Sequence, residues 1–324
     1  MKKHPSRSAI LVVAGMASLL VGLSPLVGPT RGQAQAPAGA GQIPRLAGTK
    51  VPNMGGVWQA LNEANWDLEA HGARAARVTQ PGVATGGPVP AAPVLALGST
   101  GGIPGSLGVV EGGTIPYKPE ALAQKKENFE HSLARDPEVK CLLPGVPRAT
   151  YLPYPFQLTQ SHTKVMLQYG FSNAGRTIHL DQVDDPGFES WMGHSVGRWE
   201  GDTLVVAVNN LNDQTWFDRA GNHHSGDMKV TERYTMTSPS HIQYEATIED
   251  PAVFTRAWKI KMPLYKRLED NARVFEYRCI EWVEELVYGH LRKRQLVRSW
   301  EDDYGRRGGT LGVQILRKPS KREE

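Results

Sequence analysis

Cysteine is scarce in this chain, with two residues, Cys141 and Cys279, among 324. The pair lacks C-x-x-C spacing, which excludes the common cysteine-based zinc and redox motifs. A transmembrane helix needs roughly 20 apolar residues, whereas the longest apolar run, Ala9–Leu23, has 15. We therefore do not expect an integral membrane protein. G-x-G-x-x-G after a strand, a P-loop and C-x-x-C-H are also missing, so no cofactor is predicted.

Beyond its first 34 residues the chain has no net charge of either sign. The formal charge of the whole chain is +4. The first 34 residues supply that excess, because they contain four Lys/Arg and no acid, and 33 basic and 33 acidic residues remain. Residues 291–324 hold ten Lys/Arg against five Asp/Glu, which leaves a body of −5 before a tail of +5. Such a body would not hold a phosphate backbone, and this excludes nucleic acid as a partner.

Residues 1–34 have the three-part pattern of a secretory signal: a basic start, an apolar run and small residues. Cleavage after Ala34 fits better than cleavage after Ala36, because Pro37 would directly follow the second cut. No cysteine lies near the site, which argues against a lipoprotein anchor. We expect a periplasmic or secreted protein.

This location bears on the two cysteines, because an oxidising compartment permits a disulfide. A bond between Cys141 and Cys279 would close a long loop and restrict the unfolded chain by about 4–5 kcal/mol. Two separate buried thiols are the alternative, and the sequence leaves both open.

Glycine and proline gather before the regular part of the chain. Sixteen of the 36 residues in 81–116 are Gly or Pro, which predicts an extended arm. Residues 58–80 favour a short helical or irregular segment. A helix is expected from Pro119, since proline suits a first turn and apolar residues recur on one face up to Pro137. A second helical pattern follows Cys279.

From residue 153 the hydrophobic period changes to two, which is typical of strands. We predict a mainly β protein built on an antiparallel up-and-down β-barrel of the lipocalin type, with a small-molecule cavity and one or two flanking helices. A β-sandwich is the alternative. The expected divisions are a signal peptide (1–34), a Pro/Gly-rich arm (35–116), the barrel domain (117–290) and a basic tail (291–324). The nine expected strands are 156–160, 164–169, 176–180, 196–200, 204–208, 228–236, 242–248, 254–262 and 274–279.

Alternation also predicts which side chains point inward. In 228–236, Glu232 and Tyr234 share the apolar face, and in 254–262 Arg256 and Trp258 do so. A buried charge is costly without a partner, so we expect Glu232 and Arg256 to neutralise each other inside the barrel. The pair is either a structural ion pair or a device that orients the polar group of a ligand.

The loop 209–227 is the part of the sequence richest in candidate functional side chains. Long loops that are both polar and aromatic often form mouths or lids. His224 is the predicted general acid/base, oriented by Asp213 or Asp218. No metal site is predicted, because His223 and His224 are adjacent and would point opposite ways on an extended backbone. Ser225 lacks the G-x-S-x-G context of a nucleophile.

Several runs of this chain resemble a large family of exported, mostly uncharacterised bacterial proteins from Proteobacteria and Acidobacteria. The similarity spans roughly residues 110–290, and its most specific elements are the W-E-G-D-T-L-V-V motif at 199–206 and the His224-Ser225 pair. Family members read F-H-S-D where this chain has His223-His-Ser-Gly226, so the acid is displaced to Asp227. The resemblance implies export but no particular reaction. The matching runs are 110–123, 141–148, 196–205, 212–218 and 248–256.

Two main functions follow from these patterns. The first is a secreted hydrolase or lyase that acts on a small, largely apolar molecule, with catalytic His224, Asp213, Asp218 and Glu232. The alternative is a periplasmic binding or carrier protein without turnover; a third idea is an envelope interaction protein that uses the arm 81–116. No oligomeric state is predicted. The expected substrate-binding residues are Arg256, Trp216, Tyr234, Trp258, His194 and Trp191.

Overall fold

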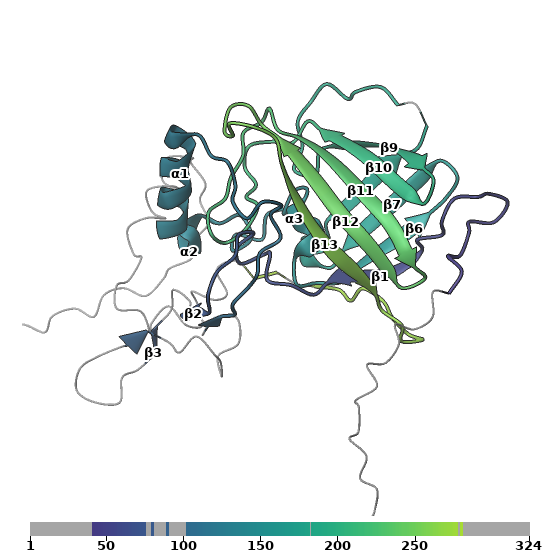
Figure 1. The fold of residues 1–324 in the computed structure, drawn as a ribbon, viewed down its shortest axis with the longest axis horizontal. Coiled ribbons are helices and arrows are strands. Elements are labelled where there is room, and N and C mark those ends of the chain that lie inside the picture. The colour runs from purple at the N-terminus through teal and green to yellow at the C-terminus, as the bar shows by residue number, and fades with distance from the viewer. Residues whose placement is uncertain are drawn as a thin grey trace, which may run out of the picture. The chain divides into compact units, whose positions relative to one another are not determined.

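The computed structural model describes residues 41–75, 79–80, 89–90, 102–181, 183–277 and 279–280. The predicted signal peptide, most of the helix after Cys279 and the basic tail lie outside these residues. The main body is a closed β-barrel (Figure 1), as predicted, rather than a sandwich. Its strands are β1 (Gly56–Ala60), β6 (Phe156–Gln160), β7 (Lys164–Tyr169), β8 (Gly175–His179), β9 (His194–Glu200), β10 (Thr203–Asn209), β11 (Lys229–Ser238), β12 (His241–Glu249) and β13 (Trp258–Lys266).

The strand order around the barrel is β1-β13-β12-β11-β10-β9-β8-β7-β6, and β6 pairs again with β1. All neighbours are antiparallel except β8 and β9, which pair in parallel with Ile178 opposite Ser195. Nine strands cannot alternate in direction around a closed barrel, because nine is odd. The connection 180–193 therefore runs back along the barrel, and the expected all-antiparallel pattern fails at this one pair.

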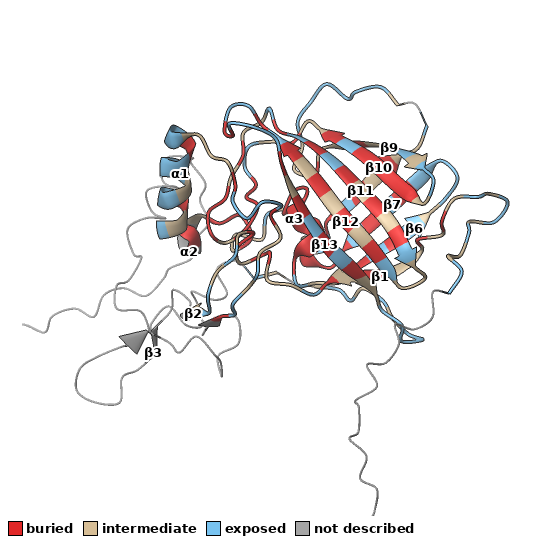
Figure 2. Ribbon diagram, viewed as in Figure 1, coloured by how far each residue is buried: buried red, intermediate tan, exposed pale blue. Residues whose placement is uncertain are grey.

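Side-chain alternation fixes the register of these strands. In β11 and β12 every second residue is buried, and Figure 2 shows buried bands that alternate with intermediate or exposed ones along the strands. Tyr234 pairs with Tyr244, and Glu232 pairs with Ala246, all on the inner face. A one-residue slip would turn this whole set outward, so burial of the inner face specifies the register.

β1 comes from a segment for which a helical or irregular conformation was predicted. Trp58 is fully buried, and its indole N–H donates to the carbonyl of Met54 at 2.8 Å. Further along the arm, Glu111 N donates to Lys259 O at 2.8 Å, so the arm also pairs with β13. The boundary predicted at residue 116 thus cuts through the barrel. Strand pairing outweighs the weak local pattern here, because an open barrel would leave backbone groups unpaired.

Two strand predictions near the end of the barrel need correction. β13 begins at Trp258 rather than Phe254, because the backbone N–H groups of Val253 and Phe254 bond to the carbonyl of Asp250 in a turn. Residues 274–277 and 279 are not in a strand; Cys279 instead forms a disulfide with Cys141.

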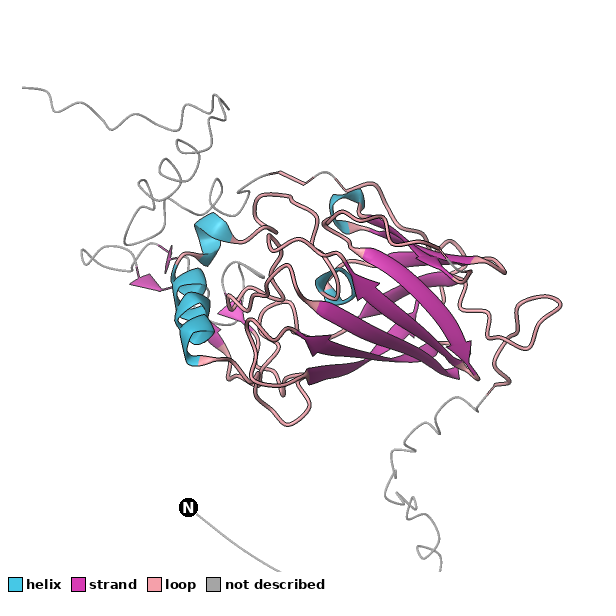
Figure 3. Ribbon diagram, turned by 90° about the horizontal axis from the view of Figure 1, so that it is seen from above, coloured by secondary structure: helices cyan, strands magenta, loops and turns pink. Residues whose placement is uncertain are grey.

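One end of the barrel is covered by the short helix α3 (Arg148–Tyr151) and the loop 210–228, which we call the end cap. The Tyr151 hydroxyl donates to the carbonyl of Phe217 at 2.8 Å and joins the two parts. The predicted helix is confirmed as α1 (Pro119–Glu130) and continues into α2 (Ser132–Arg135); Figure 3 shows both outside the barrel strands. In the part of the chain described, no helix is long and apolar enough to cross a bilayer.

Four two-residue strands in the arm form two small sheets outside the barrel. The first sheet pairs β2 (Arg74–Ala75) with β5 (Gly102–Ile103), and the second pairs β3 (Thr79–Gln80) with β4 (Val89–Pro90).

Candidate functional site

An ion pair does lie inside the barrel, but the partner of Glu232 is Arg176 of β8 and not Arg256. Both side chains are almost completely buried, at 1% and 0% exposure. Arg176 Nη2 donates to Glu232 Oε2, and Arg176 Nε donates to Ser195 Oγ at 3.0 Å. Arg256 is exposed and donates to the carbonyl of Ala257 at 3.2 Å. It lies in the turn before β13, so the expected pair is wrong.

The other oxygen of Glu232 is held by two phenols. Tyr234 donates to Oε1 at 2.9 Å and Tyr244 at 2.8 Å. Burial raises the pKa of both phenols well above the usual value, and the charge of Glu232 raises it further. Both tyrosines therefore stay protonated and act as donors. Glu232 receives three hydrogen bonds, and its charge is fully compensated.

Three polar atoms next to this pair have no hydrogen-bond partner of good geometry among the described residues: Arg176 Nη1, the Tyr169 hydroxyl and the Thr150 hydroxyl. Burial raises the pKa of Tyr169, while the charge of Arg176 and weakly aligned hydrogen bonds from the Thr150 hydroxyl and the Arg176 guanidinium lower it. The three groups therefore lie close together. Thr150 belongs to α3, so the end cap contributes to the site. We call the set the interior cluster: Arg176, Glu232, Tyr169, Tyr234, Tyr244, Ser195 and Thr150.

His224 lies buried in the end cap, and both of its ring nitrogens are engaged. Nδ1 donates to the backbone carbonyl of Ser225 at 2.8 Å, and Nε2 accepts from the Thr215 hydroxyl at 2.6 Å. Burial lowers the pKa of His224, against the opposing effects of the Ser225 carbonyl, Asp250 and Asp213. The ring is thus neutral, with its proton on Nδ1. Among the described residues, no carboxylate forms a hydrogen bond with it, although the sequence predicted such a contact.

Asp218 and Asp213 are not positioned to orient His224. Asp218 is fully buried and accepts from the backbone N–H groups of Leu68 at 2.9 Å and Ala220 at 3.0 Å, and from the side chain of Asn222 at 2.6 Å. Burial raises the pKa of Asp218 to about 7. Asp213 is exposed. The loop is a packed part of the structure in which Asp218 satisfies backbone donors.

The residues predicted to contact substrate are dispersed. Tyr234 belongs to the interior cluster, and Trp258 is 3% exposed with its ring edge-on to Phe217 at 5.3 Å. Trp216 is buried within the loop, whereas Trp191 is half-buried. His194 is also half-buried, and its ring stacks on that of His179 at 5.8 Å.

A second buried cluster of charges, which we call the cap network, supports the end cap. Arg148 binds Asp136 through both Nη atoms at 2.8 and 3.0 Å, Glu138 at 2.6 Å and the Asn65 side chain at 3.1 Å. Arg219 binds Glu138 through two nitrogens at 2.9 and 2.8 Å. Burial raises the pKa of Glu138, but Arg219 and Arg148 together bring it down to about 2.

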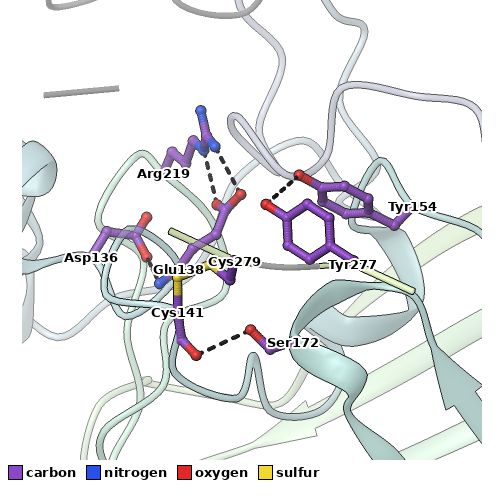
Figure 4. Close-up of a disulfide and its surroundings, with 8 residues drawn as sticks. All are labelled: Asp136, Glu138, Cys141, Tyr154, Ser172, Arg219, Tyr277 and Cys279. Atoms are coloured by element: carbon purple, nitrogen blue, oxygen red, sulfur yellow. Dashed lines mark hydrogen bonds and ion pairs between the residues drawn. A yellow bond between two sulfur atoms is a disulfide. The ribbon is translucent and has the colours of Figure 1, made fainter. Parts of the chain in front are cut away.

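The disulfide lies beside this network (Figure 4). Cys141 and Cys279 have Cα atoms 5.6 Å apart, and the Ser172 hydroxyl donates to the carbonyl of Cys141 at 3.1 Å. Tyr154 and Tyr277 share a hydrogen bond at 3.3 Å. Of the two alternatives that the sequence left open, the bridged one holds.

A groove of about 450 Å³ lies on the outer face of β6, β7 and β8. Arg176 of the interior cluster borders this groove, and the other lining residues are Gln157, Thr159, Met166, Leu167, Gln168, Gly175 and Thr177. None of the residues predicted from the sequence as a site lines it. Among the described residues, no group of three or more His, Cys, Asp or Glu is arranged to hold a metal ion.

Sequence reasoning missed most of the interior cluster. Arg176 had a usable signal, because it shares the inner face of the predicted strand 176–180 with Ile178. Thr150 had none, since it precedes the region of period two.

The chain matches no protein-family model and no curated protein sequence. A solved structure of a point variant of the fluorescent protein UnaG is similar over 45% of this chain and 90% of that one. The sequence identity is 10% and the TM-score is 0.24. A likeness this weak implies nothing about function.

Proposed function

We propose that the barrel binds one small, largely apolar molecule and holds the polar group of that molecule at the interior cluster. The observation that carries this proposal is that the donors on Arg176 Nη1, Tyr169 and Thr150 have no well-formed hydrogen bond and reach only weakly aligned neighbours within the cluster. Buried polar groups in proteins are almost always hydrogen-bonded, and each one left unpaired costs about 1–3 kcal/mol. Three such groups at one point favour a ligand that supplies the missing acceptor.

The surroundings of the cluster suit such a ligand. The inner face of the barrel is apolar apart from the cluster, and small-molecule sites combine apolar walls with a few polar groups that fix orientation. The interior of an eight-stranded barrel either is filled by side chains or holds one small ligand, and a ninth strand widens it.

Binding without turnover is favoured over a hydrolase or lyase. His224 uses both ring nitrogens for local hydrogen bonds, and its pKa is lowered by burial. In the interior cluster, Tyr234 and Tyr244 keep their protons, and Arg176 and Glu232 neutralise each other. Asp218 of the end cap has a pKa of about 7, but it is fully buried and its oxygens accept from Leu68, Ala220 and Asn222 rather than from His224. None of these groups is therefore placed to exchange protons with a ligand near pH 7.

We also propose that the protein acts in the periplasm or outside the cell. The signal pattern in residues 1–34 supports this, and so does the disulfide between Cys141 and Cys279, because disulfides persist in oxidising compartments.

Binding can be tested by ligand-observed NMR on the purified protein with two small probes, ethylbenzene and acetophenone. We expect saturable transfer of magnetisation from protein to at least one probe. Thr150→Leu adds bulk at the cluster and should weaken binding about tenfold. Thr231→Leu, on the exposed face of β11 and away from the groove, is the matched control and should bind as the unchanged protein does. Absence of saturable binding to either probe, or equal binding by the Thr150 variant, would contradict the proposal.

A further inference from the structure

We infer that the interior cluster selects an uncharged hydrogen-bond acceptor, such as the carbonyl of a ketone, ester or amide, over a carboxylate. The inference depends on the proposed binding function, and it names the chemical class of the polar group that the barrel holds. Two independent features of the cluster lead to it: its charge balance and the identity of its unpartnered atoms.

The charge balance argues against an anion. The cluster contains one cation, Arg176, and that cation already binds Glu232 directly. Both side chains are buried, so their charges act through a medium of low dielectric constant, where screening by water is weak. A ligand carboxylate beside Arg176 would lie close to Glu232 and be repelled by it. Arg148, the cation nearest along α3, is already paired with Asp136 and Glu138.

The unpartnered atoms argue for an acceptor. Arg176 Nη1 can only donate, because a guanidinium has no acceptor. The Tyr169 hydroxyl keeps its proton, since burial raises its pKa, and the Thr150 hydroxyl can also donate. A carbonyl oxygen has two lone pairs and brings no charge, so it can accept from two of these three donors without disturbing the ion pair. A ligand ammonium would instead face donors.

The test compares three probes of similar shape: acetophenone with a carbonyl, benzoate with a carboxylate, and ethylbenzene with no acceptor. Isothermal titration calorimetry on the purified protein at pH 7.5 should give acetophenone the highest affinity. We expect benzoate, which is ionised at this pH, to bind at least about tenfold more weakly. Benzoate binding as tightly as acetophenone would overturn the inference and leave the proposed function standing. Failure of all three probes would overturn the proposed function itself.

A charge change sharpens the same test. Glu232→Gln removes the anion and leaves Arg176 without a negatively charged partner. The ratio of the acetophenone affinity to the benzoate affinity should therefore fall about tenfold or reverse. Glu200→Gln removes an exposed acid from β9 and should leave the preference unchanged. An unchanged preference in a folded Glu232 variant would contradict the inference.

Tyr169→Phe is a second variant for this test, and it leaves the ion pair intact. It should weaken acetophenone about fivefold, because one donor is lost, and should leave ethylbenzene unaffected. Tyr265→Phe, on the partly exposed side of β13, is the matched control. Equal losses for both probes in the Tyr169 variant would show a purely structural effect and overturn the inference.

Discussion

The cap network and the interior cluster each bury an arginine between strands and loops, but they differ in how completely its donors are used. Every side-chain nitrogen of Arg148 has a partner in Asn65, Asp136 or Glu138. Arg176 leaves Nη1 unpaired, although both guanidiniums are equally buried at 1% exposure. Solvent therefore does not explain the difference. A satisfied network holds structure, whereas an incomplete one retains capacity for another molecule.

Removing the disulfide beside the cap network should cause the largest loss of stability. Replacing both Cys141 and Cys279 with serine releases a loop with a sequence separation of 138. We expect a loss of up to about 5 kcal/mol, because the unfolded chain gains entropy. Denaturant unfolding measures it. The variant should still bind acetophenone once folded, since the interior cluster is untouched. An identical melting temperature with and without reducing agent would contradict this prediction.

Removing either arginine tests the comparison directly. Arg148→Met strands two buried acids with only Arg219 to serve them, and it should cost about 3–5 kcal/mol. Arg176→Met should cost less, about 3 kcal/mol, because Glu232 keeps two phenol donors. Arg198→Met is the control, because this side chain is 66% exposed, and it should change stability by less than about 0.5 kcal/mol. Urea titration of the three variants ranks them, and a larger loss for Arg176 than for Arg148 would break the comparison.

The pH dependence of stability should distinguish Asp218 of the end cap from Glu138 of the cap network. Asp218 has a pKa of about 7 in the folded protein against about 4 unfolded. Asp218 therefore holds its proton more tightly in the folded state than in the unfolded state. Its contribution to the free energy of unfolding falls as the pH rises from about 4 to about 7, by at most about 1.4 kcal/mol per pH unit. Glu138, with its pKa of about 2, has the opposite sign and contributes stability that is lost only below about pH 4.

Thermal melts of the unchanged protein and Asp218→Asn between pH 4 and 8 isolate the first effect. The introduced amide would place N–H groups against existing donors, so the variant is less stable throughout. The gap between the two curves should narrow as pH rises. A gap that widens instead would show that Asp218 is ionised and stabilising in the folded state.

The smallest expected change in stability is that between two tyrosine variants of the interior cluster. Tyr244→Phe removes a hydrogen bond to a charged carboxylate and should cost about 1.5–3 kcal/mol. Tyr169→Phe removes a hydroxyl that has no well-formed hydrogen bond, and stability should change by less than about 1 kcal/mol or even rise. Unfolding free energies compare the two without ligand. Equal losses would indicate that the Tyr169 hydroxyl is already satisfied.

Local patterns predicted most of the barrel. The bounds of β6 and β7 match the prediction, and the inward orientation of Glu232 and Tyr234 followed from alternation, because a period of two is a property of the strand itself. The partner of Glu232 could not be read in this way. Alternation in 254–262 predicted Arg256 as the partner, but the turn that follows Asp250 moves the start of the strand to Trp258. Which residues meet inside the barrel depends on how the whole sheet closes.

The site shows the same limit. The sequence drew attention to the loop 209–227 because ionisable and aromatic residues are dense there. In the structure these side chains mostly serve the packing of the end cap, as Asp218 and His224 do. The parallel pair β8–β9 and the entry of β1 into the barrel depend equally on closure, which no local window of sequence contains.

The placement of β1 also sets the order in which this chain can fold. The first barrel strand in the sequence pairs with the last, Trp58 opposite Lys266, and on its other edge with β6. Neither seam can form from neighbouring segments, and the pairing of β1 with β13 requires residues as far along the chain as Lys266. Contacts between such distant segments slow folding, typically to milliseconds or seconds. A chain that lost either its first barrel strand or its last would have an open sheet with two free edges.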